Sequence, residues 1–294
     1  MKVLNYGSLN VDYVYSVDHI IVGGETQHSS KMEIFSGGKG LNQSIALAKA
    51  GVPVYHAGIV GNDGDILLDA CKEAGVNTKY IRRLPVKGGH TMIQVDKNAQ
   101  NCIILYGGTN QMQTREFVDE VLADFGEGDY LILQNEINML DYIIDQAYEK
   151  KMKIVMNPSP FDDKLNSCDL GKVYLFLVNE IEGEQITGCK DKDQILDALA
   201  EKYPNARFVL TLGSDGAVYY DGKEKVFQDI FKVKAVDTTA AGDSYTGALA
   251  VALSQDKNIE DAMDFASKVG ALSVLKEGAQ SSLPTLEDVK NFRG

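Results

Sequence analysis

The stretch between residues 130 and 212 contains four short apolar runs that alternate with segments of helical pattern. The runs read Tyr-Leu-Ile-Leu-Gln at 130–134, Lys-Ile-Val-Met-Asn at 153–157, Tyr-Leu-Phe-Leu-Val at 174–178 and Phe-Val-Leu-Thr-Leu at 208–212. Continuous apolar runs of this length are typical of parallel strands that are buried on both faces. Helices are expected around these runs, at 114–124, 140–151 and 192–203. The pattern predicts an α/β fold with a doubly wound, mainly parallel sheet flanked by helices.

The N-terminal third carries additional strand patterns. After a first strand at 2–8, alternating stretches or short apolar runs occur at 11–17, 30–35, 80–84, 91–96 and 102–106. No repeat or Pro/Ser-rich linker divides the 294 residues. We therefore expect one domain over residues 1–294, with additional β segments at about 11–35 and 77–106.

Composition and charge exclude several classes of function. The formal net charge of −13 leaves no basic surface for a phosphate backbone, which argues against a nucleic-acid partner. The chain shows neither a signal-peptide pattern nor an apolar run of membrane-spanning length, so we expect a cytoplasmic protein with no membrane partner. The four cysteines lack C-x-x-C spacing and the four histidines are isolated, so reduced thiols and no histidine metal site are expected.

Downstream of these strands, residues 237–243 read Asp-Thr-Thr-Ala-Ala-Gly-Asp and lead directly into an apolar helix at 243–254. Small side chains let a ligand approach the backbone, and the free N–H groups of a first helical turn attract anions. A carboxylate at this position, Asp243, could deprotonate a hydroxyl while a phosphoryl group is held for attack. The same turn is also compatible with a well-capped helix and no ligand.

Polar residues also stand at the start of the chain, where ligands of α/β sheets bind. Gly37-Gly38-Lys39-Gly40 precedes a helix expected at 40–50, without the spacing of a phosphate-binding P-loop. Asn10 and Asp12 follow the first strand two residues apart, so their side chains lie on one face of an extended segment. An amide beside a carboxylate suits sugar hydroxyls, although an Asx turn would use the same residues.

Further candidates follow the later strands. Glu136, Asn157 and Asn179 lie at or just past strand ends, and Glu182 lies one helical turn after Asn179. Glu182 could bind Mg²⁺ through water, or could be an ordinary acidic residue of a first helical turn. The turn at 211–216, Thr-Leu-Gly-Ser-Asp-Gly, could bind phosphate through its backbone N–H groups and the Thr211 hydroxyl.

Taken together and in this order, the motifs resemble the ribokinase/PfkB family of sugar kinases over essentially the whole chain. The resemblance rests on Gly7-Ser8-Leu9-Asn10-Val11-Asp12, Gly24-Glu25-Thr26, the glycine-rich signature at 37–51, Asn179-x-x-Glu182, the turn at 211–216 and the signature at 237–243. Within the family, these sequence motifs are most similar to those of the ribokinase branch. It implies a ribokinase-like fold in which the N-terminal β segments form a lid over the sugar and the interface of a homodimer.

The resemblance also implies residue roles. Asp243 would be the catalytic base, with Ala240, Ala241 and Gly242 as the anion hole. The implied sugar contacts are Asn10, Asp12, Gly38, Lys39, Asn42, Glu136 and Asp243. The implied nucleotide contacts are Asn179, Thr211, Gly213, Gly216 and Gly242, and Glu182 would organise Mg²⁺ indirectly. A monovalent cation, K⁺, would be bound by Asp237, Thr239, Ser273, Lys276, Gly278 and Ser282 as an activator.

The expected activity is therefore ATP-dependent phosphorylation of a primary hydroxyl of a small sugar, with D-ribose to ribose 5-phosphate as the first choice. Fructose, 2-keto-3-deoxygluconate and nucleosides including pseudouridine remain alternatives. These alternatives stay open because the sequence departs from ribose-specific members at two places. Gly23 stands where the relatives have a proline, and residues 106–111 lack the Gly-Ala-Asn motif of those members. A sugar-binding regulatory protein on the same fold is a further alternative, against which the intact Asp243 and its turn argue.

Overall fold

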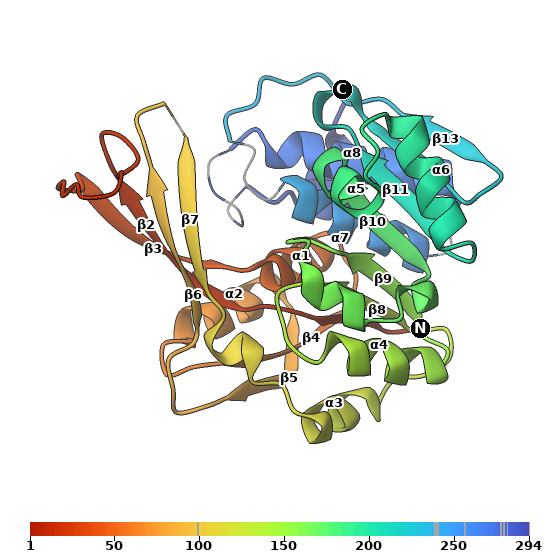
Figure 1. Ribbon diagram of the computed structural model, residues 1–294, viewed down its shortest axis with the longest axis horizontal. Helices are drawn as coiled ribbons and strands as arrows, with labels where there is room; N and C mark the ends of the chain where they lie inside the picture. The colour runs from red at the N-terminus through yellow and green to blue at the C-terminus, as the bar shows by residue number, and fades with distance from the viewer. Residues whose placement is uncertain are drawn as a thin grey trace.

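The computed structural model describes residues 1–98, 100–237, 241–255, 257–276, 278, 280 and 282–293. In this part of the chain the larger sheet has nine strands in the order β13-β12-β11-β10-β9-β8-β1-β4-β5 (Figure 1). Neighbours from β5 to β11 pair in parallel, whereas β12 and β13 pair antiparallel at one edge. The strands are β1 (Val3–Tyr6), β4 (Val54–Val60), β5 (Asn77–Arg83), β8 (Tyr130–Gln134), β9 (Lys153–Asn157), β10 (Leu175–Asn179), β11 (Arg207–Thr211), β12 (Ala217–Tyr220) and β13 (Lys225–Gln228). The expected mainly parallel sheet is confirmed.

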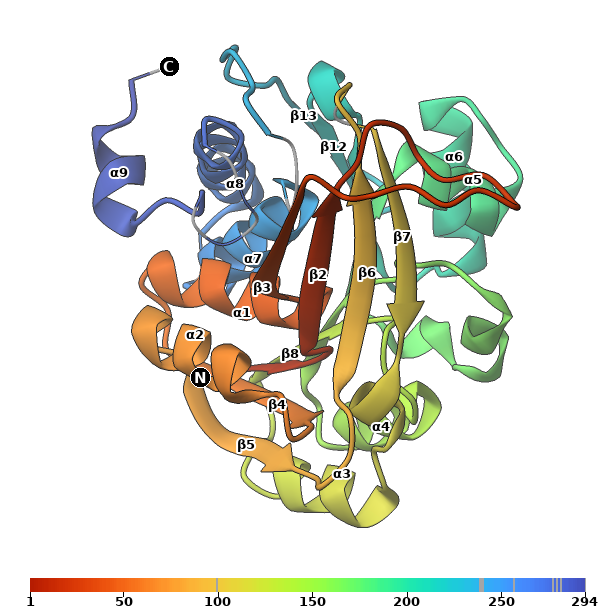
Figure 2. The same ribbon diagram turned by 90° about the vertical axis from the view of Figure 1, so that its left-hand side faces the viewer.

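Helices cover both faces of this sheet (Figure 2). One face carries α1 (Lys39–Lys49), α2 (Asp65–Ala74), α7 (Ala241–Ser254), α8 (Ile259–Ser273) and α9 (Leu286–Asn291). The other carries α3 (Arg115–Leu122), α4 (Leu140–Glu149), α5 (Glu180–Thr187) and α6 (Lys192–Lys202). Successive strand residues feed opposite cores: Ile132 packs on the first face and Leu131 and Leu133 on the second. Within the described ranges, no helix is long and apolar enough to cross a lipid bilayer.

A second sheet of four strands, β3-β2-β6-β7, projects from the body of the molecule (Figure 1). Its strands are β2 (Asn10–Ser16), β3 (Lys31–Gly37), β6 (Gly89–Val95) and β7 (Asn101–Tyr106). We call these four strands the lid sheet. They come from the two N-terminal segments in which additional strands were expected.

The expected start of the second lid segment, residue 77, is wrong. Strand β5 pairs in parallel with β4 at the edge of the large sheet. The reason is burial: Tyr80 of β5 is 5 % exposed and packs against Tyr55 and Phe125 of the main body. The second lid segment therefore begins at Gly89, the first residue of β6.

The strand order reverses direction between β1 and β8. From β1 the chain proceeds outward to β4 and β5, then returns to β8 on the opposite side of β1 and continues outward to β11. Connections that diverge in this way leave a crevice at the carboxyl ends of the two central strands, where ligands of open α/β sheets bind. The residues that follow β1 and β8 are therefore the first to consider for function.

Candidate active site

The glycine-rich turn before α1 lies directly against the segment that follows β1. Gly38 has a φ of 96°, which favours glycine, and a Cβ at Gly40 would lie 2.5 Å from the Ser8 nitrogen. The Gly40 N–H donates to Ser8 Oγ at 3.3 Å and the Leu41 N–H donates to Ser8 O at 3.0 Å. This close approach places Lys39 beside the start of the lid sheet.

Asp243 lies in the first turn of α7 and faces α1. Its side chain accepts two amide N–H groups, from Asn42 Nδ2 to Oδ2 at 3.4 Å and from Gln43 Nε2 to Oδ1 at 3.1 Å. The two helices are close because Gly247 has no side chain: a Cβ there would lie 3.0 Å from Ala46 Cβ. Asp243 is 8 % exposed, so a carboxylate is held at the N-terminus of a helix, largely out of water.

Lys39 provides positive charge among several carboxylates. The negative charge of Asp243 raises the pKa of Lys39, burial opposes this effect, and Glu136 and Glu182 add to the rise. Glu136 accepts hydrogen bonds from the Ser8 hydroxyl and, at 3.2 Å, from the Lys39 N–H. Burial raises the pKa of Glu136, while the charge of Lys39 acts in the opposite direction. Lys39 therefore stays protonated near neutral pH and can face an anionic ligand.

A cavity of about 180 Å³ opens beside Asp243. Predicted residues of several kinds line it, from α1, α5, α7 and the ends of β10 and β11. They are the base Asp243, the anion-hole residues Ala241 and Gly242, the nucleotide contacts Asn179 and Thr211, the sugar contact Lys39 and the Mg²⁺ residue Glu182. The structure thus brings together residues that lie up to about 200 positions apart in the sequence. Ala240 lies outside the described residues.

The predicted sugar contacts Asn10 and Asp12 lie on β2 of the lid sheet and do not line the 180 Å³ cavity. Asp12 Oδ1 accepts the Thr91 hydroxyl at 2.6 Å, and Asn10 Oδ1 accepts Asn110 Nδ2 at 2.7 Å. Burial raises the pKa of Asp12 to about 6; the hydrogen bond from Thr91 opposes the rise and the charge of Glu136 adds to it. Asp12 therefore changes charge close to neutral pH.

Several of the predicted nucleotide and Mg²⁺ residues also have structural roles. Asn179 and Glu182 form a reciprocal cap at the start of α5, with Asn179 N to Glu182 Oε2 at 3.0 Å and Glu182 N to Asn179 Oδ1 at 2.8 Å. Gly213 and Gly216 belong to the turn after β11 and do not line the 180 Å³ cavity. Gly216 has a φ of 93°, and a Cβ there would collide with Gln228 O of β13.

The predicted cation residues come together in part. Asp237 Oδ2 accepts the Gly278 N–H at 2.9 Å, which joins the segment before α7 to the segment after α8. Ser273 is buried and its hydroxyl donates to Gly270 O at 2.8 Å, whereas Lys276 is exposed. Ser282 is also buried, at 2 % exposure, and Thr239 lies outside the described residues.

Several residues of the site were not among the predicted ones. Ser8, Gln43, Thr91 and Asn110 each hydrogen-bond a predicted site residue. Two of them carried a local signal, since Ser8 stands at the end of the first strand and Gln43 is next to Asn42. Thr91 and Asn110 carried none, because their partners on β2 are 79 and 100 residues away.

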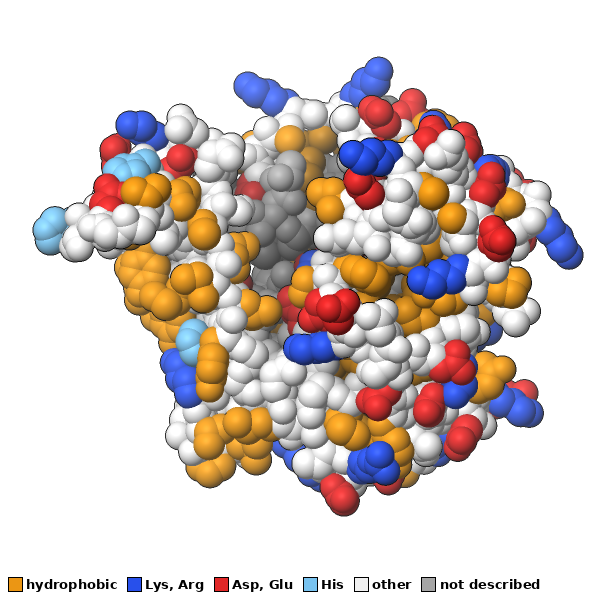
Figure 3. Space-filling model, in the orientation of Figure 1, with side chains coloured by type: hydrophobic (Ala, Val, Ile, Leu, Met, Phe, Trp, Pro, Cys, Tyr) orange, Lys and Arg blue, Asp and Glu red, His pale blue; other side chains and the backbone are white. Residues whose placement is uncertain are grey.

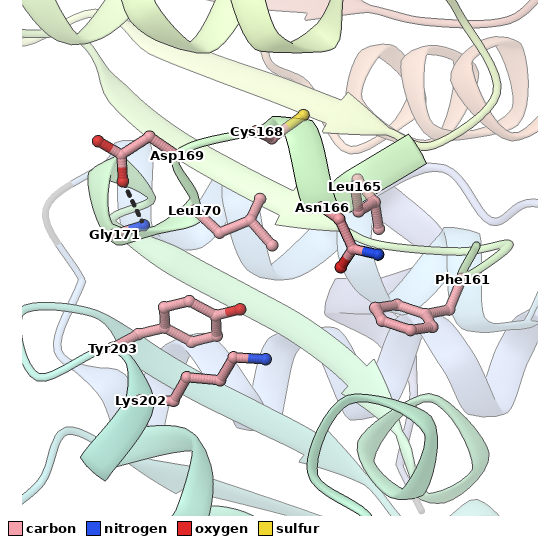
Figure 4. A pocket seen from close by; sticks show the side chains of 9 residues that line it. All are labelled: Phe161, Leu165, Asn166, Cys168, Asp169, Leu170, Gly171, Lys202 and Tyr203. Atoms are coloured by element: carbon pink, nitrogen blue, oxygen red, sulfur yellow. Dashed lines mark hydrogen bonds between the residues drawn. The ribbon is translucent and has the colours of Figure 1, made fainter. Parts of the chain in front are cut away.

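A larger cavity of about 350 Å³ lies elsewhere, between the connection that follows β9 and the end of α6. In Figure 4, Phe161, Leu170 and Tyr203 line it, and Asp169 accepts the Gly171 N–H. None of the predicted site residues that the structure describes contributes to it. The chemistry of the lining, and not the volume, therefore identifies the smaller cavity as the candidate active site.

Comparison with known proteins gives a consistent result. The family model described as pfkB family carbohydrate kinase matches residues 1–286. A ribokinase from Staphylococcus aureus is 33% identical over 98% of both chains, and a deoxyribokinase from Salmonella typhimurium is 30% identical over 99% of this chain and 98% of its own. The structure of Arabidopsis thaliana ribokinase complexed with ribose and ATP superposes with a TM-score of 0.89 at 27% identity, over 99% of both chains. The chain belongs to the pfkB family of carbohydrate kinases.

Proposed function

We propose that this protein is a ribokinase, which transfers the γ-phosphoryl group of ATP to the primary hydroxyl of D-ribose and releases ribose 5-phosphate and ADP. The observation that carries the proposal is the position of Asp243. Its carboxylate borders the 180 Å³ cavity with the predicted nucleotide residues Asn179 and Thr211. It also hydrogen-bonds α1, whose first residue donates its N–H to the predicted sugar residue Glu136. A base between a sugar and a nucleotide is what phosphoryl transfer to a hydroxyl requires.

In the proposed mechanism, Asp243 accepts the proton of the sugar hydroxyl as its oxygen attacks the γ-phosphorus and the bond to the ADP oxygen breaks. Ala241 and Gly242 begin α7, so the N–H groups of this first turn have no partners within the helix. These groups, at the positive end of the helix dipole, would stabilise the charge on the transferred phosphoryl. They are oriented before the reaction, so little reorganisation is needed.

Lys39 would contact the transferred phosphoryl as well as the sugar, because it lines the cavity and lies beside Asp243. Among the described residues, no cluster of three His, Cys, Asp or Glu side chains suits direct metal ligation. Glu182 at the cavity wall fits a Mg²⁺ ion that is held mainly by nucleotide phosphates and reached through water. Bound Mg²⁺ would supply further neutralisation of phosphate charge.

Asn10, Asp12 and Glu136 would bind the sugar hydroxyls, with the Gly38 backbone and Asn42 completing the sugar site. An ionised Asp12 accepts hydrogen bonds from two hydroxyls more strongly than a neutral group does. On the opposite side, Asn179 and Thr211 would contact the nucleotide, with Gly213 and Gly216 shaping the turn beyond them. The cytoplasm, where ATP is made available, is the compartment that we propose for this reaction.

A monovalent cation would be bound by oxygen atoms of Asp237, Thr239, Ser273, Gly278 and Ser282 and by the backbone carbonyl of Lys276, with K⁺ as the activating ion. The hydrogen bond between Asp237 and Gly278 supports the proposal, because it brings two of these segments together just before α7. A cation at this position would fix the turn that presents the N–H groups of α7.

We also propose that the lid sheet forms a homodimer interface. Paired residues place Ile34, Tyr13, Met92 and Ile104 in one row across all four strands. Ile34, Met92 and Ile104 are 47 to 61 % exposed, and hydrophobic side chains gather over this part of the surface in Figure 3. A contiguous apolar face of this kind is typical of a surface that is covered by a partner.

The test of the proposed function is a panel of acceptors assayed for ADP release with MgATP: D-ribose, 2-deoxy-D-ribose, D-fructose, 2-keto-3-deoxygluconate and pseudouridine. We expect the highest kcat/KM with D-ribose, and ³¹P NMR should place the phosphate on its primary hydroxyl. Deoxyribose serves as the matched comparison, because it differs from ribose by one hydroxyl. A higher kcat/KM for another acceptor would refute ribose as the preferred substrate. If no acceptor in the panel led to ADP release, the proposed kinase activity would be refuted.

A further inference from the structure

A chain of buried side-chain amides leads from the centre of the large sheet to Asp243. Gln43 of α1, Gln134 at the end of β8 and Asn5 of β1 are each 0 % exposed. Gln134 Nε2 donates to Asn5 Oδ1 at 3.0 Å and to Gln43 Oε1 at 2.7 Å, and Gln43 Nε2 donates to Asp243 Oδ1 at 3.1 Å. The proposed mechanism gives none of these three amides a role.

The orientation of every amide in this chain is set at its far end. Asn5 Nδ2 donates to Gly40 O at 2.8 Å, and a backbone carbonyl can only accept. Asn5 must therefore turn its oxygen to Gln134, Gln134 must turn its nitrogen to both neighbours, and Gln43 must turn its oxygen to Gln134. As a result, Gln43 always presents an N–H group to Asp243.

The fold makes room for this chain at some cost. A Cβ at Gly7 would collide with Gln134 Oε1 and would lie 2.8 Å from the Gly40 Cα, so the amide of Gln134 lies against a backbone position that only glycine fits. Gln134 Oε1 is itself buried with no hydrogen-bond partner among the described residues. An unsatisfied buried oxygen destabilises the folded protein, so stability does not account for an amide at position 134, whereas orientation of its neighbours does.

We infer that Gln43 is a positioning residue for Asp243: the amide chain Asn5–Gln134–Gln43 holds the carboxylate in one orientation. The inference rests on the proposed function, in which Asp243 is the base. Its physical reason is that the N–H group of Gln43, whose direction is fixed by the amides behind it, bonds Oδ1 of Asp243 and so limits rotation of the carboxylate. The other charged groups that act on this carboxylate are Lys39 from α1 and Glu136 after β8, and Glu182 from α5 lines the same cavity.

The first test replaces Gln43 with methionine, which has a similar volume and no N–H group. We expect Gln43→Met to lower kcat roughly 10- to 100-fold, the value of a hydrogen bond to a charged group, with KM for sugar and ATP changed less than about threefold. The matched control is Gln113→Met, since Gln113 is also buried but accepts from the Tyr6 hydroxyl outside the site. An unchanged kcat, a change confined to KM, or an equal loss in the control would overturn the inference.

The second test uses the coupling between amides. Gln134→Met should lower kcat in the same direction, and Gln43→Met combined with Gln134→Met should be no slower than Gln43→Met alone, because Gln134 acts through Gln43. Losses that multiply in the double variant would contradict a chain.

The third test needs no activity and separates this inference from the proposed function. Gln43→Glu keeps the shape and the contact with Gln134 but places a carboxylate against Asp243. At pH 7 this variant should melt below Gln43→Met, because two carboxylates at hydrogen-bond distance repel each other. If the wild type phosphorylates no sugar, the proposed function fails; if Gln43→Glu and Gln43→Met melt alike at pH 7, the amide chain fails.

Discussion

The hydrogen bond from Thr91 to Asp12 joins two strands of the lid sheet and controls the charge of a proposed sugar contact. Thr91 is buried, at 7 % exposure, and its hydroxyl lies 2.6 Å from Asp12 Oδ1. Burial raises the pKa of Asp12 to about 6, and the Thr91 hydrogen bond limits that rise. Replacing Thr91 with valine removes the hydroxyl and keeps the shape of the side chain. We therefore expect Thr91→Val to raise the pKa of Asp12 further.

The size of the effect follows from the strength of the lost bond. A hydrogen bond to a charged group contributes about 1.5–3 kcal/mol, and about 1.4 kcal/mol corresponds to one pH unit. If the ionised form of Asp12 binds the sugar, KM for the sugar is constant well above pH 6 and rises as the pH falls through about 6. In Thr91→Val this rise should begin roughly one to two pH units higher, so that KM near pH 6.5 increases roughly 3- to 25-fold.

The assay is a set of sugar saturation curves between about pH 5 and 9 with saturating MgATP, and ATP saturation curves at the same pH values. KM for ATP should not follow the shift. Thr109→Val is the matched control, since the buried Thr109 hydroxyl donates to Ile59 O at 2.7 Å and not to Asp12. A Thr91→Val variant whose KM profile coincides with the wild type, or is raised equally at every pH, would refute the reasoning.

Four further outcomes are expected from the same structure. Asp243→Asn should lower kcat by about 10²- to 10⁴-fold while circular dichroism and ATP binding stay unchanged, and a wild-type kcat would remove its role as base. Asp12→Ala should weaken sugar binding by roughly 1.5–3 kcal/mol in calorimetry with little effect on ATP, and equal losses for both would make Asp12 structural. Ile104→Glu, at a side chain that is 61 % exposed, should convert a dimer to a monomer in light scattering, and a monomeric wild type would refute the lid interface. Turnover should rise with K⁺ over a Na⁺ background and lose this response in Asp237→Ala; rates indifferent to K⁺ would argue against the cation site.

The central part of the fold could be predicted because its signals are local. The runs at 130–134 and 153–157 coincide with β8 and β9, since a strand buried on both faces must be apolar at every position. The partner of β5 could not be predicted in this way. Strand 77–83 has no apolar run that marks a central strand, and its place beside β4 depends on the packing of Tyr80 against residues that are distant in sequence.

The residues of the candidate site also fall into those that the sequence could predict and those that it could not. Asp243 and Lys39 could be identified because they lie in short motifs of small residues before a helix, which indicate a turn that a ligand can approach. The residues that hold them in place could not, because a buried glutamine or threonine in a sequence has no distinguishing neighbour. Gln43 and Thr91 gain their roles from partners 200 and 79 residues away, and this information exists once the chain has folded.

The junction between α1 and α7 also has a consequence for protein synthesis. Gln43 leaves the ribosome 200 residues before its partner Asp243, which at 5–20 residues per second is a delay of roughly 10 to 40 s. During that interval the apolar side of α1 that α7 will cover, around Ala46, has no C-terminal helix to pack against. A nascent or truncated chain that ends before α7 would therefore hold most of the sugar site without the base, and would expose a surface that chaperones recognise.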